Sequence, residues 1–244
     1  MPKLWAKGCS EAHQYACEQL STAGFSILQA PDKTIDGVLL DVPSFRGTDL
    51  ADIAWEELPE NAIVIGGNLA KHVPDRFRSI DLLRDPEFTA QNADITARCA
   101  LRLAAGHLKQ TYRRLPVLIL GWGRIGKCLA RLLRALDAEV WVYARKEADR
   151  AMLRALGYRA LPLPPEEADL SRFRLIYNTA PAPMLSSEKT AALGSCVLMD
   201  LASSPGMDGP RVISARGLPG LLAPESSGAL IADTLTRLWK ERHT

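Results

Sequence analysis

The sequence lacks any apolar run close to the roughly 20 residues that a membrane-spanning helix requires. Its beginning, Met1-Pro2-Lys3-Leu4-Trp5-Ala6-Lys7, has no long apolar core after the charge and no cleavage site, so it is not typical of a signal peptide. The five cysteines are scattered, without a CxxC pair or a Cys/His cluster, which argues against a zinc site or a disulfide framework. We therefore expect a cytoplasmic protein with no metal and no membrane partner.

An excess of charge of one sign is also missing. The 244 residues carry 30 Lys and Arg against 28 Asp and Glu, a net charge of +2. This balance gives no overall field toward nucleic acid, although local basic spots remain possible. Hydrophobic residues at 47% and charged residues at 24% are ordinary for soluble globular proteins, which excludes a disordered tail, a collagen-like repeat and a coiled coil.

Short apolar runs and helical patterns alternate from end to end, which is typical of a parallel α/β sheet. In the second half we expect helices over 125–136 and 147–156, among strands at 117–120, 139–144, 158–161, 175–178, 196–200 and 211–214. The first half has a weaker pattern, with a helix over 10–23 and strands at 3–6, 25–28, 37–40 and 62–65. A long helix over 86–108 leads into the strand at 117.

This pattern predicts an α/β protein with two domains. We expect a smaller N-terminal α/β (flavodoxin-like) domain over 1–90, on the substrate or partner side, and a linking helix over 91–115. A Rossmann-type doubly wound parallel sheet is expected over 116–225, and a C-terminal helix over 226–244.

A glycine pattern, Gly121-Trp122-Gly123-Arg124-Ile125-Gly126, closes a predicted strand and opens an amphipathic helix. In this G-x-G-x-x-G the first glycine permits a tight turn, the second lets backbone N–H groups approach a pyrophosphate, and the third lets the helix pack on the strand. The helix N-terminus would add about half a positive charge toward the phosphates. The six residues therefore predict a dinucleotide site, the alternative being a glycine-rich turn without a ligand.

The end of the next strand predicts which dinucleotide binds. An NAD site usually has an acid there, on the ribose 2′-OH, whereas this chain reads Tyr143-Ala144-Arg145-Lys146. Arg145 and Lys146 would pair with a 2′-phosphate that a carboxylate would repel. We therefore expect Ala144, Arg145 and Lys146 to favour NADP over NAD, unless the two cations are only a solvated helix start.

Polar residues follow two further predicted strands, at Asn178-Thr179-Ala180-Pro181 and at Asp200-Leu201-Ala202-Ser203. Ligands of open α/β sheets bind at the carboxyl ends of the strands, so we expect the first segment to contact the cofactor. Ordinary turn chemistry is the alternative for both. A third segment, from Gly217 to Gly228, either caps the last helix or closes over the cofactor.

Taken in order, these segments resemble the A-type subunit of dipicolinate synthase, and the resemblance covers roughly residues 35–240. Upstream, Gly37-Val38-Leu39-Leu40-Asp41-Val42-Pro43 and Asn92-Ala93-Asp94-Ile95-Thr96-Ala97 are also similar to that family. The resemblance implies an NAD(P)-dependent oxidoreductase that oxidises a dihydrodipicolinate-type ring, from a lysine/diaminopimelate pathway precursor, to dipicolinate. It also implies sporulation as the context and a second, flavoprotein-like B-type subunit as partner. We further expect a homo-oligomer.

The same resemblance leads to candidate residues for the chemistry. Asp94 and Asp200 are candidates for acid/base work, each with a structural role as the alternative. The expected contacts of a small dicarboxylate substrate are Asn92, Thr96, Arg98 and Ser203. Arg98 stands where the family pattern leads us to expect an acidic residue, and it would pair with a substrate carboxylate. No histidine is expected to be catalytic, His72 being a minor candidate.

Two other functions remain open. Asn178-Thr179-Ala180-Pro181 also resembles the Asn-rich strand end of shikimate-dehydrogenase-like NADP oxidoreductases, but the first domain shows no persuasive Lys/Asp pair. The stretch between Asp200 and Gly217 is shorter than the family pattern leads us to expect. That shortening leaves open a second alternative, a non-catalytic NADP-binding partner or sensor subunit.

Overall fold

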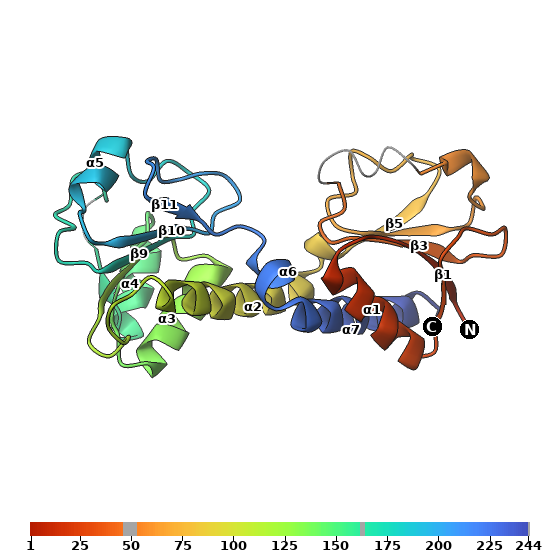
Figure 1. The fold of residues 1–244 in the computed structure, drawn as a ribbon, viewed down its shortest axis with the longest axis horizontal. Helices are drawn as coiled ribbons and strands as arrows, with labels where there is room; N and C mark the ends of the chain where they lie inside the picture. The colour runs from red at the N-terminus through yellow and green to blue at the C-terminus, as the bar shows by residue number, and fades with distance from the viewer. Residues whose placement is uncertain (46–52, 162–163, 244) are drawn as a thin grey trace. The chain divides into compact units, whose positions relative to one another are not determined.

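The computed structural model describes residues 1–45, 53–161 and 164–243, and the chain forms two compact units. The first unit comprises Met1–Ile95 and Pro219–Thr244, and the second comprises Thr96–Leu218. Each unit contains one parallel sheet flanked by helices (Figure 1), so the predicted α/β class is confirmed.

The second unit has a six-stranded sheet in the order β11-β10-β9-β6-β7-β8, and every neighbouring pair is parallel. Its strands are β6 Pro116–Leu120, β7 Glu139–Tyr143, β8 Arg159–Ala160, β9 Leu175–Asn178, β10 Val197–Asp200 and β11 Val212–Ser214. This is the doubly wound order, and the chain reverses its direction of winding between β6 and β9. The predicted Rossmann-type sheet is therefore confirmed.

The helices of this unit follow from their apolar faces. They are α3 Arg124–Ala135, α4 Glu147–Ala155 and α5 Ser187–Ala192, and Figure 1 shows α3 and α4 on one side of the sheet and α5 on the other. In α3, Leu129 and Leu133 are fully buried while Arg131 and Arg134 are exposed, as expected for an amphipathic helix on a sheet. The central strand β6 is apolar throughout because helices cover both of its faces.

The first unit has a five-stranded parallel sheet in the flavodoxin-like order β2-β1-β3-β4-β5. Its strands are β1 Lys3–Lys7, β2 Ser26–Leu28, β3 Gly37–Leu40, β4 Ile63–Gly66 and β5 Arg78–Asp81. Short 3-10 turns occur at Trp55–Glu57 and Leu82–Arg84. Strand β5 was not predicted, because Ile80 is the single apolar side chain in it.

The C-terminal helix belongs to the core of the first unit. Helix α7 (Pro224–His243) lies beside α1 (Glu11–Thr22) (Figure 1). A Cβ at Gly228 would stand 2.7 Å from the Ala12 carbonyl oxygen, so the two backbones approach closely. Leu235 and Trp239 join the core formed by the sheet and α1. The segment expected as a separate helix over 226–244 thus completes the first unit, and Thr244 lies outside the described residues.

The long helix α2 spans Pro86–Ala105, and the boundary between the units falls inside it, after Ile95. The expected linking helix over 91–115 therefore ends ten residues early, in the turn that follows Ala105. A short helix, α6 (Leu218–Leu222), occupies the other boundary. Among the residues that the structure describes, no helix is both long and apolar enough for a bilayer crossing.

Candidate functional site

The glycine loop after β6 has the geometry that a tight turn requires. Gly121 has φ +110°, a conformation that side chains with a Cβ rarely adopt, and its N–H donates to the Tyr143 carbonyl at 3.0 Å. An added Cβ would stand 2.6 Å from Thr179 Oγ1. At Gly126 an added Cβ would collide with the Gly121 carbonyl oxygen, so this glycine lets α3 lie against the loop.

Gly123 differs from its two neighbours in the motif. It is the N-cap of α3 in an extended conformation, no side chain caps the helix, and an added Cβ would meet nothing within 4 Å. The first N–H groups of a helix have no intrahelical partners, and here no cap side chain takes their place. The loop therefore offers an open approach to a helix N-terminus, which fits a pyrophosphate.

The remaining residues of the glycine loop differ in their burial and in their contacts. Trp122 packs against Tyr158 with ring centroids 5.7 Å apart, and Lys127 Nζ lies 5.8 Å from the Trp122 ring centroid. Arg124 is exposed and Ile125 is half-buried. The loop is thus held from one side by an aromatic pair.

The end of β9 supports the loop from the neighbouring strand. Thr179 donates to the Leu120 carbonyl twice, from its N–H at 2.8 Å and from Oγ1 at 3.0 Å. Asn178 is fully buried, and its amide bonds both the N–H and the carbonyl of Ala180 at 3.1 Å. The segment through Pro181 is therefore fixed beside Gly121, as the cofactor prediction requires.

Asp200, predicted as catalytic, is 3% exposed at the end of β10. Its Oδ1 accepts hydrogen bonds from Asn178 Nδ2 and Ala202 N, both at 3.0 Å. Its Oδ2 accepts from Gly206 N at 2.7 Å and Met207 N at 3.1 Å. These contacts shape the loop after β10, and an acid/base role for Asp200 stays a prediction. Ser203, predicted as a substrate contact, is exposed on this loop.

The predicted 2′-phosphate residues lie in the turn between β7 and α4. Ala144 is buried, whereas Arg145 and Lys146 are exposed. Within the described ranges, neither of these two cations has a hydrogen-bond or ion-pair partner for its side chain. Lys146 is the N-cap of α4 and no side chain caps that helix.

The candidates on α2 fall on two faces of one helix. At about 100° per residue, Asn92 and Thr96 are one turn apart on the same face, while Asp94 and Arg98 share a face nearly opposite. Thr96 is 8% exposed, Asp94 is half-buried and Arg98 is exposed. The helix therefore brings these four residues together as two pairs.

A polar cluster at the carboxyl ends of β1 and β3 was not singled out from the sequence. Asp41 accepts hydrogen bonds from Cys9 N at 2.9 Å, from Ser10 N at 3.2 Å and from Ser10 Oγ. Burial alone would raise the pKa of Asp41, but these hydrogen bonds and the nearby His13 outweigh it and lower the pKa below 3.8. The cluster anchors the start of α1, where Ser10 is the N-cap.

His72, the minor catalytic candidate, stacks on Phe45 with ring centroids 4.1 Å apart. It is exposed at the end of the turn that follows β4. His13 is buried and its Nε2 donates to the Leu39 carbonyl at 3.1 Å, which gives it a structural partner.

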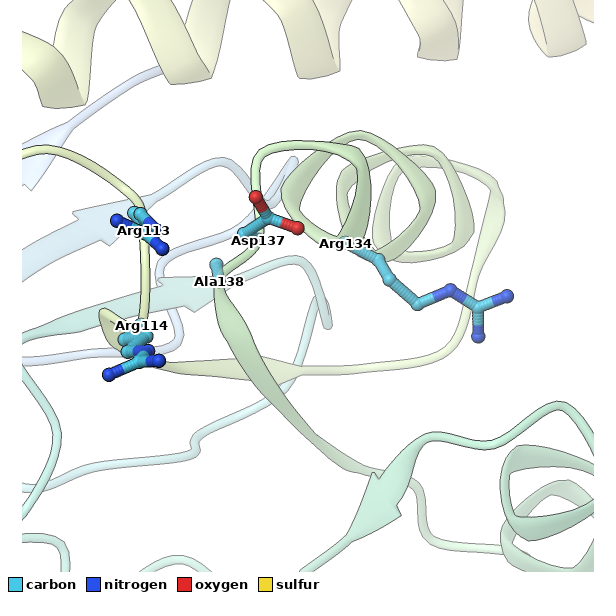
Figure 2. Close-up of a pocket in the computed structure, with 5 residues that line it drawn as sticks. All are labelled: Arg113, Arg114, Arg134, Asp137 and Ala138. Atoms are coloured by element: carbon cyan, nitrogen blue, oxygen red, sulfur yellow. The ribbon is translucent and has the colours of Figure 1, made fainter.

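A hollow on the second unit lies at the amino ends of β6 and β7, away from the glycine loop. Figure 2 shows its lining, made of Arg113, Arg114, Arg134, Asp137 and Ala138. Arg134 extends away from the other two arginines (Figure 2) and donates to the Leu156 carbonyl at 2.7 Å. The three guanidinium groups therefore do not converge on one point.

The total charge of the chain is close to zero, but the two units carry net charges of opposite sign. Thr96–Leu218 holds 19 of the 30 Lys and Arg but 10 of the 28 Asp and Glu, a net charge of +9. The remaining residues hold 11 basic and 18 acidic side chains, a net charge of −7. The unit with the glycine loop therefore attracts anions.

Comparison with known proteins agrees with the motif series, although no family model matches the chain. The A-type subunit of dipicolinate synthase from Bacillus subtilis (strain 168) is 24% identical over 244 residues, covering 88% of this chain and 82% of that protein.

Solved structures share the fold. The corresponding dipicolinate synthase subunit from Bacillus halodurans has a TM-score of 0.80 at 22% identity, covering 97% of both chains. An L-alanine dehydrogenase has a TM-score of 0.68 at 12% identity, covering 97% of this chain and 88% of its own. The fold is thus that of dehydrogenase-type oxidoreductases. In its sequence the chain is similar to the A-type subunit of dipicolinate synthase, as its motif series predicts, and it shares the fold of that subunit.

Proposed function

We propose that this chain is an NADP-dependent oxidoreductase that oxidises a dihydrodipicolinate-type ring to dipicolinate. The observation that carries the proposal is the glycine loop at the switch point between β6 and β9, where Gly123 leaves the uncapped N-terminus of α3 open. Homology to a dipicolinate synthase subunit supports the choice of substrate.

The cofactor would be held by backbone groups and by two cations. The loop 121–126 would bind the pyrophosphate, and the fixed segment 178–181 would line the next part of the molecule. Arg145 and Lys146 would bind the 2′-phosphate, since no acid lies between Tyr143 and Lys146. Each of these groups orients the cofactor, whose nicotinamide supplies the hydride chemistry when bound.

The substrate side of the reaction needs a base and cation partners. Aromatising a dihydropyridine ring removes one hydride and one proton, so a base must take the proton. Asp94 and Arg98 share one face of α2, and we assign the proton to Asp94 and a substrate carboxylate to Arg98. Asn92 and Thr96 lie on the nearly opposite face of α2, so they and Ser203 stay separate predictions of substrate contacts. Asp200 is the second candidate base, although its carboxylate already accepts four hydrogen bonds.

The assembly is part of the proposal. The homologue is named as one subunit of dipicolinate synthase, which implies an enzyme of more than one kind of chain. We propose a flavoprotein-like B-type subunit as the partner of a homo-oligomer of this chain, working in the cytoplasm of a sporulating cell.

A turnover assay tests the proposal. The full chain would be mixed with NADP and a dihydrodipicolinate-generating mixture, with and without the flavoprotein-like partner, and NADPH formation followed by absorbance. We expect NADP reduction that depends on the generated substrate, and we expect none when shikimate is supplied in its place. Nucleotide binding without turnover in any mixture would instead support the non-catalytic partner role.

A further inference from the structure

The turn that carries Arg145 and Lys146 is held by a third cation, Arg150, in the second turn of α4. Arg150 Nη1 donates to the carbonyl oxygens of Ala144 and Arg145, each at 2.8 Å. One guanidinium nitrogen thus takes two successive backbone acceptors at the point where β7 ends. Without it these carbonyls would have water as their alternative partner.

The same guanidinium also holds the first acid after β7. Arg150 Nε donates to Glu147 Oε2 at 2.9 Å, and Nη2 lies 2.7 Å from the same oxygen. Arg154 Nη2 takes the other oxygen, Oε1, at 2.9 Å. Hydrogen bonds from Arg154 and then Arg150 lower the pKa of Glu147, so the carboxylate stays charged and paired.

These contacts have two consequences for a 2′-phosphate. The backbone of residues 144 and 145 is fixed, so the Arg145 and Lys146 side chains start from one defined turn rather than from several. In addition, Glu147 would repel a phosphate bound beside it, and its pairing with two arginines reduces that repulsion. Within the described ranges Arg150 makes no hydrogen bond to the pyrophosphate loop 121–126, so both effects act first at the 2′-phosphate.

We propose that Arg150 is a positioning residue for cofactor selectivity, which fixes the 144–146 turn and neutralises Glu147 so that the site prefers NADP over NAD. This inference rests on the proposed function, because it assumes that the chain binds a nicotinamide dinucleotide. It adds a residue that acts through the backbone and through Glu147, and it needs no contact between Arg150 and the phosphate.

The test compares dissociation constants for NADPH and NADH in the full chain, with the Arg150→Met and Arg150→Lys variants. NADH lacks the 2′-phosphate, so it reports damage to the rest of the site. Arg154→Met is the matched control, since Arg154 pairs with Glu147 from one turn further along and, among the described residues, its guanidinium bonds no backbone carbonyl.

We expect Arg150→Met to weaken NADPH binding about tenfold and NADH binding less than about twofold, the size of a lost charge-assisted hydrogen bond. Arg150→Lys keeps the charge but cannot span both carbonyls and Glu147, so it should recover less than half of the loss. Arg154→Met should change the NADPH/NADH ratio by less than about twofold.

An unchanged NADPH/NADH ratio in Arg150→Met would overturn the inference while leaving the proposed cofactor site intact. Full recovery by Arg150→Lys would also overturn it, because charge alone would then suffice. Failure of the unmodified chain to bind either nucleotide would instead contradict the proposed function itself.

Discussion

Asn178 Nδ2 donates to Asp200 Oδ1 at 3.0 Å, which ties the carboxyl ends of the neighbouring strands β9 and β10 together. Both side chains are buried, and the amide and the carboxylate between them bind Ala180, Ala202, Gly206 and Met207. Gly206 must be glycine here, because an added Cβ would lie 2.6 Å from the Ala182 carbonyl oxygen. The pair fixes the segment after β9, in which Thr179 and Ala180 lie beside Gly121.

The hydrogen bonds of this pair predict that substitution of Asp200 lowers the free energy of unfolding, whether or not Asp200 also acts as a base. Asp200→Ala leaves the N–H groups of Ala202, Gly206 and Met207 without an acceptor and removes one of the two hydrogen bonds of Asn178 Nδ2. Asp200→Asn turns an NH₂ group toward N–H donors. We expect each variant to lose about 3 kcal/mol or more of unfolding free energy in urea titrations. Ser203→Ala, on the exposed part of the same loop, should stay within about 0.5 kcal/mol. An Asp200→Asn protein with full stability but no turnover would show that Asp200 is a base instead.

The glycine loop gives a second prediction, because two of its glycines have different surroundings. Gly121→Ala combines a strained φ with a clash against Thr179 and should cost about 1–3 kcal/mol of stability. Gly123→Val introduces its side chain into open space, so stability should change by less than about 1 kcal/mol while NADPH binding is lost. Thermal unfolding and nucleotide titration of both variants measure this contrast. Equal nucleotide binding by Gly123→Val and the unmodified chain would mean that nothing binds at this loop.

The lowered pKa of Asp41 makes part of the stability dependent on pH. A carboxyl with a depressed pKa in the folded state contributes stability that is present above its unfolded value and disappears as the pH falls through its folded value. The unmodified chain should therefore be more stable than Asp41→Asn near neutral pH, and the difference should shrink as the pH falls below 3.8. Asp75→Asn, an exposed site in the same unit, serves as control. A difference that does not change with pH would show that the Asp41 charge has no role.

The separation of charge between the units predicts salt-sensitive nucleotide binding. Thr96–Leu218 carries a net charge of +9, and NADPH carries one more phosphate than NADH. Raising the salt from about 0.05 M to about 0.5 M shortens the Debye length several-fold. NADPH affinity should therefore fall more steeply with salt than NADH affinity, as titrations at several salt concentrations would show. Parallel slopes for the two nucleotides would contradict binding of the 2′-phosphate by cations.

The sequence predicted the second unit well because its signals are strong and local. Buried strands such as Pro116–Leu120 and the stripe of α3 have one physical interpretation each, and the glycine spacing marks the turn between them. The edge strand Arg78–Asp81 was missed because an exposed edge needs few apolar residues. The six residues of α5 are too few to show a helical period.

The site was only partly predictable for a different reason. Asp200 and Arg150 hydrogen-bond backbone groups that the fold brings close to them. The sequence around each residue does not show which backbone groups these are. The arrangement of the α2 candidates, in contrast, follows from the sequence spacing alone. Two residues of an α-helix separate Asp94 from Thr96 by about 200° around the helix axis. A motif places residues near a site, whereas the helix phase decides which of them share a face.

Calorimetric titration of the full chain with NADPH and with NADH measures whether this chain binds a nicotinamide dinucleotide and which one it prefers. We expect saturable binding of both nucleotides at one site per chain, with NADPH binding about tenfold or more tightly. Absence of saturable binding by either nucleotide, in a chain that remains folded by circular dichroism, would contradict it.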